Sequence, residues 1–430
     1  MPTALLLIAL IVPLVGAYRS SVTPRGIVIT HVSLFSFGAI FYWIIPIALG
    51  ESRIFSSDSS LALWYAFFAS HTSPATITSY LLIVTGFYLA FCAGSWCGRR
   101  LALPGVIVEL FPFEPGFLVL GLPFAVAVVA AYAFALRHQF FAGYSGLWNG
   151  DAGPRGSFTA AAMLLLDVAF LHVVMRRPTR RRWWANIFVV SFALTSLLLL
   201  SLGGRLYVAS AILMALVYRT QFVEKARTRT VILGGVLGVL GAGLTGIVRL
   251  GGALSITTLA ANIASEPLFT SFSLIQFLSR QRFEWWNFPR FLLGDLINLV
   301  PTSLFPDKAR YLLDPEAFGY VVFSPLGALN SFFSLTINFG VIGALIPLFA
   351  LGLTLSLLQR QPAKLLRIVY SILTGWLAFT FFRDPFAVSV VKNMLEFGVL
   401  VPFGIVIGLH VLTVASSPMV DRNRLSLETR

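Results

Sequence analysis

The sequence predicts an all-α polytopic membrane protein, and three observations lead to that prediction. Hydrophobic residues make up 57% of the 430 residues and charged residues only 11%, whereas a soluble domain carries about 25% charged residues. The apolar residues gather in eleven runs, most of which have about the length that a helix needs to cross a bilayer. The formal net charge of +14 lies on one side of these runs, as the positive-inside bias of membrane proteins requires. One integral domain, residues 1–430, is therefore expected.

The eleven expected spans follow one another with short connections at all places but one. They are Thr3–Ala17, Ile27–Leu49, Ile77–Ser95, Phe117–Leu136, Phe158–Met175, Ala185–Leu202, Leu206–Val217, Val231–Val248, Ile337–Leu358, Ile368–Phe382 and Phe386–Ala415. The stretch Leu61–Ser70 is too short to cross the bilayer and is expected to lie flat at its interface. Six glycines in Val231–Val248 are interpreted as positions of close helix packing, or as room for a lipid tail.

The basic segments predict the orientation of the chain in a bacterial inner (cytoplasmic) membrane. Cations concentrate in residues 19–25, 99–100, 176–182, 219–229, 360–367 and 422–430, and such segments face the cytoplasm. The N-terminus is then periplasmic and the C-terminus cytoplasmic. Because the excess of basic residues is explained by topology, nucleic-acid binding is not expected.

One long interval, 249–336, separates two expected spans and falls on the outer, periplasmic side. It carries six cations, six acids and many aromatic residues. Disordered segments are poor in aromatic residues, and long ordered loops usually have a function. This large periplasmic loop is therefore expected to fold, partly as helix, into a cap over a site.

Motifs of the common enzyme classes are missing from the sequence. It contains no Walker A pattern, no HExxH, no GxSxG and no Asp-x-Asp pair, and its five histidines are scattered singly. Neither a metal site nor a cofactor is therefore expected.

Arginines at the outer ends of three hairpins are the strongest candidates for a site. Arg205 follows a Gly-Gly pair at the tip of a tight hairpin, Arg249 ends a glycine-rich span, and Arg383 stands beside Asp384 at the tip of the last hairpin. The positive-inside bias disfavours arginine on this side, and a guanidinium is suited to bidentate contact with phosphate oxygens. The alternative for each arginine is a snorkelling anchor or a structural ion pair.

Two ionisable residues lie inside the last expected span. Lys392 and Glu396 are four positions apart, so they share one face of a helix. Ionisable groups at membrane depth face the interior of the bundle or a wet cavity, and Asp167 is a candidate partner. The pair either lines a polar cavity below the long loop or fixes helix packing.

Three short segments carry a family resemblance. One contains Pro301, Phe305–Lys308 and the sequence Asn-Phe-Gly at 338–340, which is expected to open a helix; the other two are the hairpin that begins at Arg205 and the last hairpin around Arg383. These segments resemble bacterial oligosaccharide repeat-unit polymerases of the O-antigen polymerase type, and the number of apolar runs agrees over nearly the whole chain. The resemblance implies a GT-C-like arrangement of helices.

The resemblance also implies a reaction and its participants. Enzymes of this family join oligosaccharide repeat units carried on undecaprenyl pyrophosphate, a lipid-linked substrate in the bilayer, and release undecaprenyl pyrophosphate. The product is a surface polysaccharide such as the O-antigen of lipopolysaccharide, a capsule or an exopolysaccharide. A chain-length regulator and a flippase are the implied partners.

The resemblance assigns roles to residues of this chain as follows. Arg205, Arg249 and Arg383 are expected to neutralise the leaving pyrophosphate. Glu266 and Asp384 are the candidates for a general base, although no carboxylate here matches an agreed catalytic residue of the family. A mechanism without a carboxylate base is the alternative. Substrate contacts are expected from Arg280, Arg282, Arg290, Lys308, Trp285, Trp286, Asn338, Lys392 and Glu396.

Three other functions remain open at this point. An O-antigen ligase has a similar architecture but carries a loop His-Ser/Thr dipeptide, and here the only such dipeptide is His71-Thr72, before the third span. A transporter or flippase usually shows internal repeats and broken helices, and the sequence shows no repeat. The last alternative is a non-catalytic membrane assembly protein.

Overall fold

The computed structural model describes residues 2–54, 61–101, 126–140, 158–159, 161–163, 165–166, 187–202, 204–250, 255–280, 294, 296–297, 300, 304–311, 330–400, 404, 407–408 and 411. Within these ranges nearly all regular structure is helical, which confirms the all-α class. The exception is a short antiparallel hairpin of β1 (Val22–Thr23) and β2 (Gly26–Ile27).

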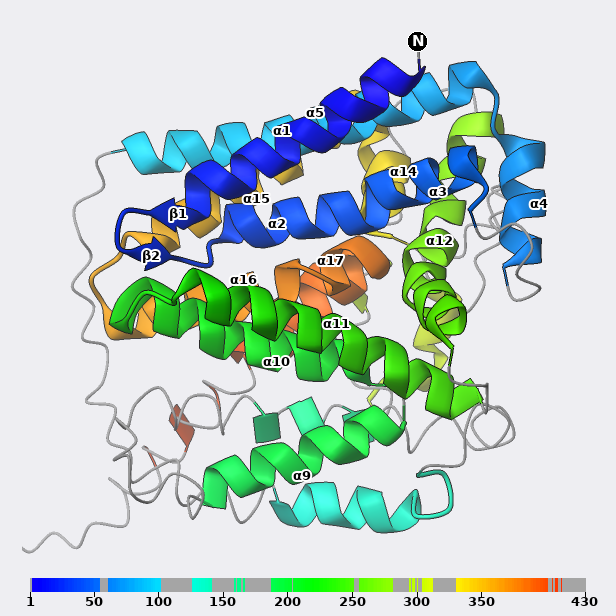
Figure 1. The fold of residues 1–430 in the computed structure, drawn as a ribbon. Helices are drawn as coiled ribbons and strands as arrows, with labels where there is room; N and C mark the ends of the chain where they lie inside the picture. The colour runs from blue at the N-terminus through cyan, green and yellow to red at the C-terminus, as the bar shows by residue number, and fades with distance from the viewer. Residues whose placement is uncertain are drawn as a thin grey trace, which may run out of the picture.

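Five helices in the described ranges are long and apolar enough to cross a membrane. They are α1 (Pro2–Ser21), the continuous run of α2 (His31–Ala39), η1 (Ile40–Ile44) and α3 (Ile45–Ser52), then α5 (Pro74–Arg100), α10 (Arg205–Tyr218) with η2 (Arg219–Val223), and α11 (Thr228–Leu250). The shorter helices α9 (Ile187–Ser201), α15 (Leu345–Gln359) and α16 (Lys364–Leu377) run roughly along them (Figure 1). The expected spans Phe117–Leu136, Phe158–Met175 and Phe386–Ala415 lie wholly or partly outside the described residues.

The described basic segments meet at one end of the bundle, called here the basic end. The β1–β2 hairpin pairs with the segment just before α11, since Ile27 and Ala226 exchange backbone hydrogen bonds of 2.9 and 3.0 Å. Arg360, which follows α15, donates through Nη1 to the carbonyls of Gly98, Arg99 and Leu101 at 2.7–3.1 Å. A cation is favourable at the carbonyl end of a helix, so this contact ties α15 to the end of α5.

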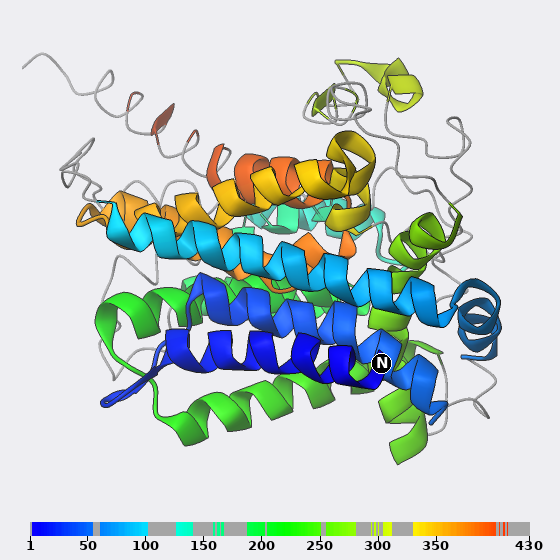
Figure 2. The same ribbon diagram turned by 90° about the horizontal axis from the view of Figure 1, so that it is seen from above.

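Helices that run across the bundle occupy the opposite end. In both views the spans lie horizontally, whereas α12 (Ile256–Arg280) and α4 (Ala62–His71) stand across them (Figures 1 and 2). The expected interfacial stretch 61–70 is thus a helix across the spans. The long interval 249–336 is partly helical, because it contains α12, the 3₁₀-helix η4 (Pro306–Tyr311) and part of α14 (Ser331–Gly343).

The expected span Ile337–Leu358 is wrong as a single straight helix. The axes of α14 and α15 differ by 104°, and Gly340, inside α14 and close to its end, has the non-helical angles φ 70° and ψ 172°. Only glycine adopts such a backbone conformation readily, so the Asn-Phe-Gly sequence breaks a helix where it was expected to open one. The straight segment begins at Leu345, and α14 turns across the end of the bundle beside α12.

Glycines bring α5 and α15 into close contact. A Cβ atom at Gly94 would overlap the carbonyl oxygen of Phe349, and one at Gly352 would overlap the carbonyl oxygen of Phe91. One turn further along α5, a Cβ at Gly98 would lie 2.8 Å from the Leu353 carbonyl oxygen. The backbones themselves therefore touch, as in other small-residue helix interfaces of membrane proteins.

The glycines of α11 are different, and the packing interpretation holds for only two of them. Gly243 and Gly246 face α12, where added Cβ atoms would meet Leu259, Ile263 and Asn262. Added Cβ atoms at Gly234, Gly235, Gly238 and Gly241 would meet nothing within 4 Å among the described residues. The close helix approach expected there is therefore not seen in this part of the structure.

Replacing Gly94 or Gly352 by alanine is expected to lower the thermal unfolding temperature of the purified protein in detergent. The two helix backbones would have to separate, which costs on the order of 1–3 kcal/mol for an overpacked contact. Gly238→Ala is the matched control, because its Cβ enters open space and alanine is the better helix former by about 1 kcal/mol. Unchanged stability of both α5–α15 variants would contradict the close contact.

A cluster of aromatic rings forms a core between α2, α5, α14 and the short helix before Asp384. Phe35 of α2 stacks on Phe91 of α5 with ring centroids 3.8 Å apart. The same ring contacts Phe332 of α14 and Phe382 of α17 (Thr380–Arg383). This core therefore fixes the positions of α14 and α17, which carry part of the candidate site.

Candidate functional site

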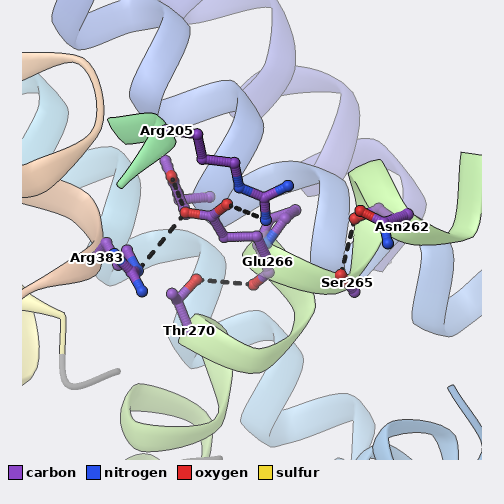
Figure 3. Close-up of polar contacts among 8 residues, drawn as sticks. Arg205, Asn262, Ser265, Glu266, Thr270 and Arg383 are labelled. Atoms are coloured by element: carbon purple, nitrogen blue, oxygen red, sulfur yellow. Dashed lines mark hydrogen bonds and ion pairs between the residues drawn. The ribbon is translucent and has the colours of Figure 1, made fainter. Parts of the chain in front are cut away.

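Two of the three predicted arginines meet on one carboxylate at the end of the bundle opposite the basic end (Figure 3). Arg205 Nη2 lies 2.9 Å from Glu266 Oε2, and Arg383 Nε lies 3.6 Å from Glu266 Oε1. The hydroxyl of Tyr42 donates a hydrogen bond of 3.1 Å to the same Oε1. We call these four residues the Glu266 cluster. The three charged side chains are 16–34% exposed, so they are half-buried.

Arg205 is positioned by the tight turn between α9 and α10. The Gly204 N–H donates to the Leu199 carbonyl at 2.7 Å, and a Cβ at Gly204 would lie only 3.1 Å from that same oxygen. Arg205 then becomes the first residue of α10. A cation is disfavoured at the N-terminal end of a helix by the helix dipole, so the contact with Glu266 offsets an unfavourable placement.

Arg383 is positioned by the turn that follows α17. Asp384 precedes Pro385 and has extended backbone angles, φ −102° and ψ 155°, because a residue before proline is disfavoured in the helical region. Ser331 Oγ of α14 donates to the Asp384 carbonyl at 2.8 Å. The backbone N–H of Phe386 donates to Ser334 Oγ at 2.9 Å. Helix α14 thus holds the tip of the last hairpin in place.

Glu266 lies in the middle of α12, directly before Pro267. Proline has no N–H to continue the helical hydrogen bonds, and the carbonyl of Pro267 itself accepts a bond of 2.9 Å from Thr270 Oγ1 (Figure 3). Because α12 lies across the ends of the spans, its inner face presents Glu266 to hairpins that are distant in sequence. Three otherwise separate parts of the chain therefore meet at one carboxylate.

The surroundings of Arg383 keep its guanidinium charged. Burial raises the pKa of the Asp384 carboxyl, and the neighbouring Arg383 guanidinium lowers it again, with a net shift upward. Burial acts against the charge on Arg383, but Asp384 and Glu266 together raise the pKa of its guanidinium above the usual value. Arg383 therefore stays charged, and Asp384 carries its negative charge less readily than an ordinary aspartate. Two guanidiniums that converge on a single carboxylate form a site to which phosphate oxygens can bind.

The other predicted site residues are only partly described. The backbones of Arg249, Arg280 and Lys308 lie at the ends of α11 and α12 and in η4, and their side chains lie outside the described structure. The predicted residues Arg282, Arg290, Trp285 and Trp286 lie outside it altogether. The predicted convergence of Arg249 with the other two arginines therefore stays a prediction.

Three further predicted residues lie in α14 and in the segment that follows α17. Asn338 is 1% exposed, and its Nδ2 donates to the Ser334 carbonyl at 2.8 Å within α14. Lys392 and the partly buried Glu396 lie in η7 (Ala387–Leu400), which is a π-helix where an α-helix was expected. The side chain of Lys392 and the whole of Asp167, its candidate partner, lie outside the described residues.

Two other features bear on the alternatives. Within the described ranges, no three His, Cys, Asp or Glu side chains gather closely enough to hold a metal ion. His71 ends α4, where its ring stacks on Phe67 at 4.2 Å and its Nδ1 lies 2.8 Å from Ser70 Oγ. These contacts lie within α4 itself, and the Glu266 cluster shares none of them.

Tyr42 is the member of the Glu266 cluster that sequence reasoning missed. It is 2% exposed and lies in η1, a π-helical segment in the middle of a span. Such segments are frequent at functional sites, but nothing in the apolar sequence around residues 40–44 distinguishes them from an ordinary helix. The aromatic residues there read as packing or as an interfacial belt.

Comparisons with known proteins add no family assignment. No family model, curated protein or solved structure matches this chain. The candidate site is therefore interpreted from its own geometry.

Proposed function

We propose that this protein is a membrane glycosyltransferase that joins undecaprenyl-pyrophosphate-linked oligosaccharide repeat units into a surface polysaccharide. The observation that carries the proposal is the convergence of Arg205 and Arg383 on Glu266, because guanidiniums bind phosphate oxygens and can neutralise a leaving pyrophosphate. The three residues come from three different segments of the chain. The remaining expected spans and a GT-C-like arrangement belong to this proposal, as does a periplasmic location of the site.

In the proposed reaction, a hydroxyl oxygen of the acceptor repeat unit forms a bond to the anomeric carbon of the donor sugar. The bond between that carbon and the phosphate oxygen breaks, and undecaprenyl pyrophosphate leaves. Arg205 and Arg383 stabilise the negative charge that develops on the leaving oxygen. The hydroxyl proton passes to a nearby base, for which Glu266 and Asp384 are the candidates.

Two features near the Glu266 cluster support this assignment of roles. Helices α12 and α14 cover the ends of the spans next to the cluster, so a substrate headgroup would be enclosed there while its lipid tail stays between helices. The aromatic-rich part of the long interval continues from α12 in sequence, and aromatic faces suit sugar rings. Lys392 and Glu396 are proposed to line the inner side of the same region.

A transporter is the alternative that one observation favours. The bent pair α14–α15 is a broken helix, and transporters use broken helices to bind their substrates. In this protein, however, α14 packs on α12 and α17 at the end of the bundle, beside the arginine cluster. A broken helix in this position can equally well hold the residues of an enzyme site in place.

Deletion of the gene in its host is the experiment that tests the proposed function. The surface glycan is expected to shrink to a single repeat unit, which electrophoresis of extracted glycolipid measures directly. Complete loss of attached glycan would instead indicate a ligase, and lipid-linked units trapped on the cytoplasmic face would indicate a flippase. Glycan of unchanged length would contradict all three functions.

A further inference from the structure

We propose that Glu266 is a resident counter-anion, which holds the place between Arg205 and Arg383 that a phosphate group of the ligand takes when it binds. The carboxylate keeps the two guanidiniums in position, and the ligand displaces it. The inference rests on the proposed function in taking the ligand to be a diphosphate.

The geometry of the ion pairs is that of a bridge. Each carboxylate oxygen faces a different arginine, since Oε2 lies 2.9 Å from Arg205 Nη2 and Oε1 lies 3.6 Å from Arg383 Nε (Figure 3). The two arginines belong to α10 and α17, which are separate hairpins. A carboxylate has two acceptor oxygens and one charge, whereas a diphosphate has more of both. A diphosphate therefore satisfies both guanidiniums better than Glu266 does.

Tyr42 provides a hydrogen bond that the Glu266 carboxylate keeps after the ligand displaces it from the arginines. Its hydroxyl donates to Glu266 Oε1 at 3.1 Å from a buried position in η1. A carboxylate that loses its partners in a half-buried place costs free energy, and this neutral donor keeps one bond in place when the guanidiniums turn to the ligand. The same bond holds the side chain beside the site, ready to return when the ligand leaves.

The single negative charge of Glu266 also sets a minimum charge that a ligand needs in order to displace it. With Glu266 removed, the two guanidiniums would lose the carboxylate that they share, at side chains that are only 23% and 34% exposed. Asp384 would still offset the charge on Arg383, but no shared carboxylate would screen the repulsion between the two guanidiniums. A singly charged anion gains no charge over Glu266 and does not displace it efficiently. An anion with two or more negative charges does displace it, which matches a pyrophosphate and excludes simple carboxylates.

Titration calorimetry of the purified full-length protein in detergent, with inorganic pyrophosphate as the probe, tests the inference. Glu266→Gln removes the competing charge and is expected to bind pyrophosphate about tenfold more tightly than the unmodified protein, the scale of one lost contact to a charged group. Its unfolding temperature should be lower without pyrophosphate and should rise more when pyrophosphate is added. A purely structural role for Glu266 predicts the lower temperature without the larger rise.

Three further variants complete the test. Glu224→Gln breaks a comparable ion pair, 3.7 Å from Arg219 at the basic end, and should leave pyrophosphate binding unchanged. Glu266→Asp keeps the charge on a shorter side chain and should bind pyrophosphate with an intermediate affinity. This variant replaces Glu266→Gln in the test if Glu266→Gln does not fold. Asp384→Asn removes one negative charge beside Arg383 without touching Glu266. If Asp384→Asn and Glu266→Gln increase the affinity for pyrophosphate equally, the affinity depends on net charge alone and the proposal is wrong.

The outcomes separate this inference from the proposed function. If Glu266→Gln binds pyrophosphate no more tightly than the unmodified protein, the counter-anion role is wrong, whatever the arginine variants do to polymer length. If Glu266→Gln binds pyrophosphate more tightly but cells that lack the gene still make full-length polymer, the counter-anion role stands and the polymerase function fails.

Discussion

Replacing Arg205 and Arg383 together by alanine is expected to stop growth of the surface polymer after single repeat units. Each guanidinium is proposed to stabilise the charge that develops on the leaving pyrophosphate, and loss of one such preorganised donor slows a reaction on the order of 100- to 1,000-fold. The single variants should therefore give strongly shortened chains and the double variant almost none. Electrophoresis of the extracted polysaccharide measures the chain length.

The control for this prediction is Arg219→Ala. Arg219 also pairs with a glutamate, Glu224, but it is 71% exposed and lies at the basic end. An exposed ion pair contributes little to stability, so this variant should make polymer of normal length. Arg249→Ala tests the third predicted arginine in the same assay. Full-length polymer from all three outer-arginine variants, at normal protein levels in the membrane, would show that the arginines do not carry the reaction.

Replacing Phe35 by alanine is expected to have the largest effect on stability. Its side chain is fully buried and contacts the rings of Trp43, Tyr88, Phe91, Phe332, Phe381 and Phe382. Truncation of a buried phenylalanine costs about 3–5 kcal/mol, mostly through the cavity that remains. Because Phe382 directly precedes Arg383, the loss should also loosen the arginine that contacts Glu266.

Two measurements check the Phe35 prediction. The unfolding temperature in detergent should fall steeply for Phe35→Ala and little for Phe37→Ala, which truncates a 39% exposed ring two residues further along the same helix. Polymer length should fall with Phe35→Ala even in cells grown at a temperature where the protein remains folded. Equal stability of the two variants would contradict the aromatic core.

Helical periodicity and apolar length were enough to predict much of the fold. The segments 3–17, 77–95 and 231–248 and all of 27–49 after residue 30 lie in long helices, because a long run of apolar residues leaves few alternatives. The predicted break at 249–336 was also informative, since its charges and aromatics differ from those of a span. The sequence does not show, however, that this interval begins with a helix lying across the bundle.

The errors concern backbone geometry that apolar patterns do not encode. The segment 337–358 is apolar throughout, so nothing in its hydropathy marks the bend at Gly340, which depends on positive φ and on packing against α12 and α17. Gly94 and Gly98 of α5 meet the backbone of α15, whereas four of the six glycines of α11, which were interpreted as packing positions, meet no described residue. Whether a glycine packs depends on the partner helix, and one sequence does not identify that partner.

The candidate site was predicted in its charges but not in its arrangement. Arg205 and Arg383 are predicted because the expected topology disfavours arginine at those hairpin ends, and Glu266 is predicted as a candidate general base, without its contact to either arginine. Their meeting point follows from the course of α12 across the hairpins. Tyr42 enters the cluster from a span that carries no other polar signal near it, so only the three-dimensional structure identifies it.

Reconstitution of the purified protein in vesicles with undecaprenyl-pyrophosphate-linked repeat units tests the central claim most directly. The account predicts chains of many repeats, with one undecaprenyl pyrophosphate released for each glycosidic bond formed, and neither product from the variant with Arg205 and Arg383 replaced by alanine. Polymer formation by that double variant at the rate of the unmodified protein would contradict it.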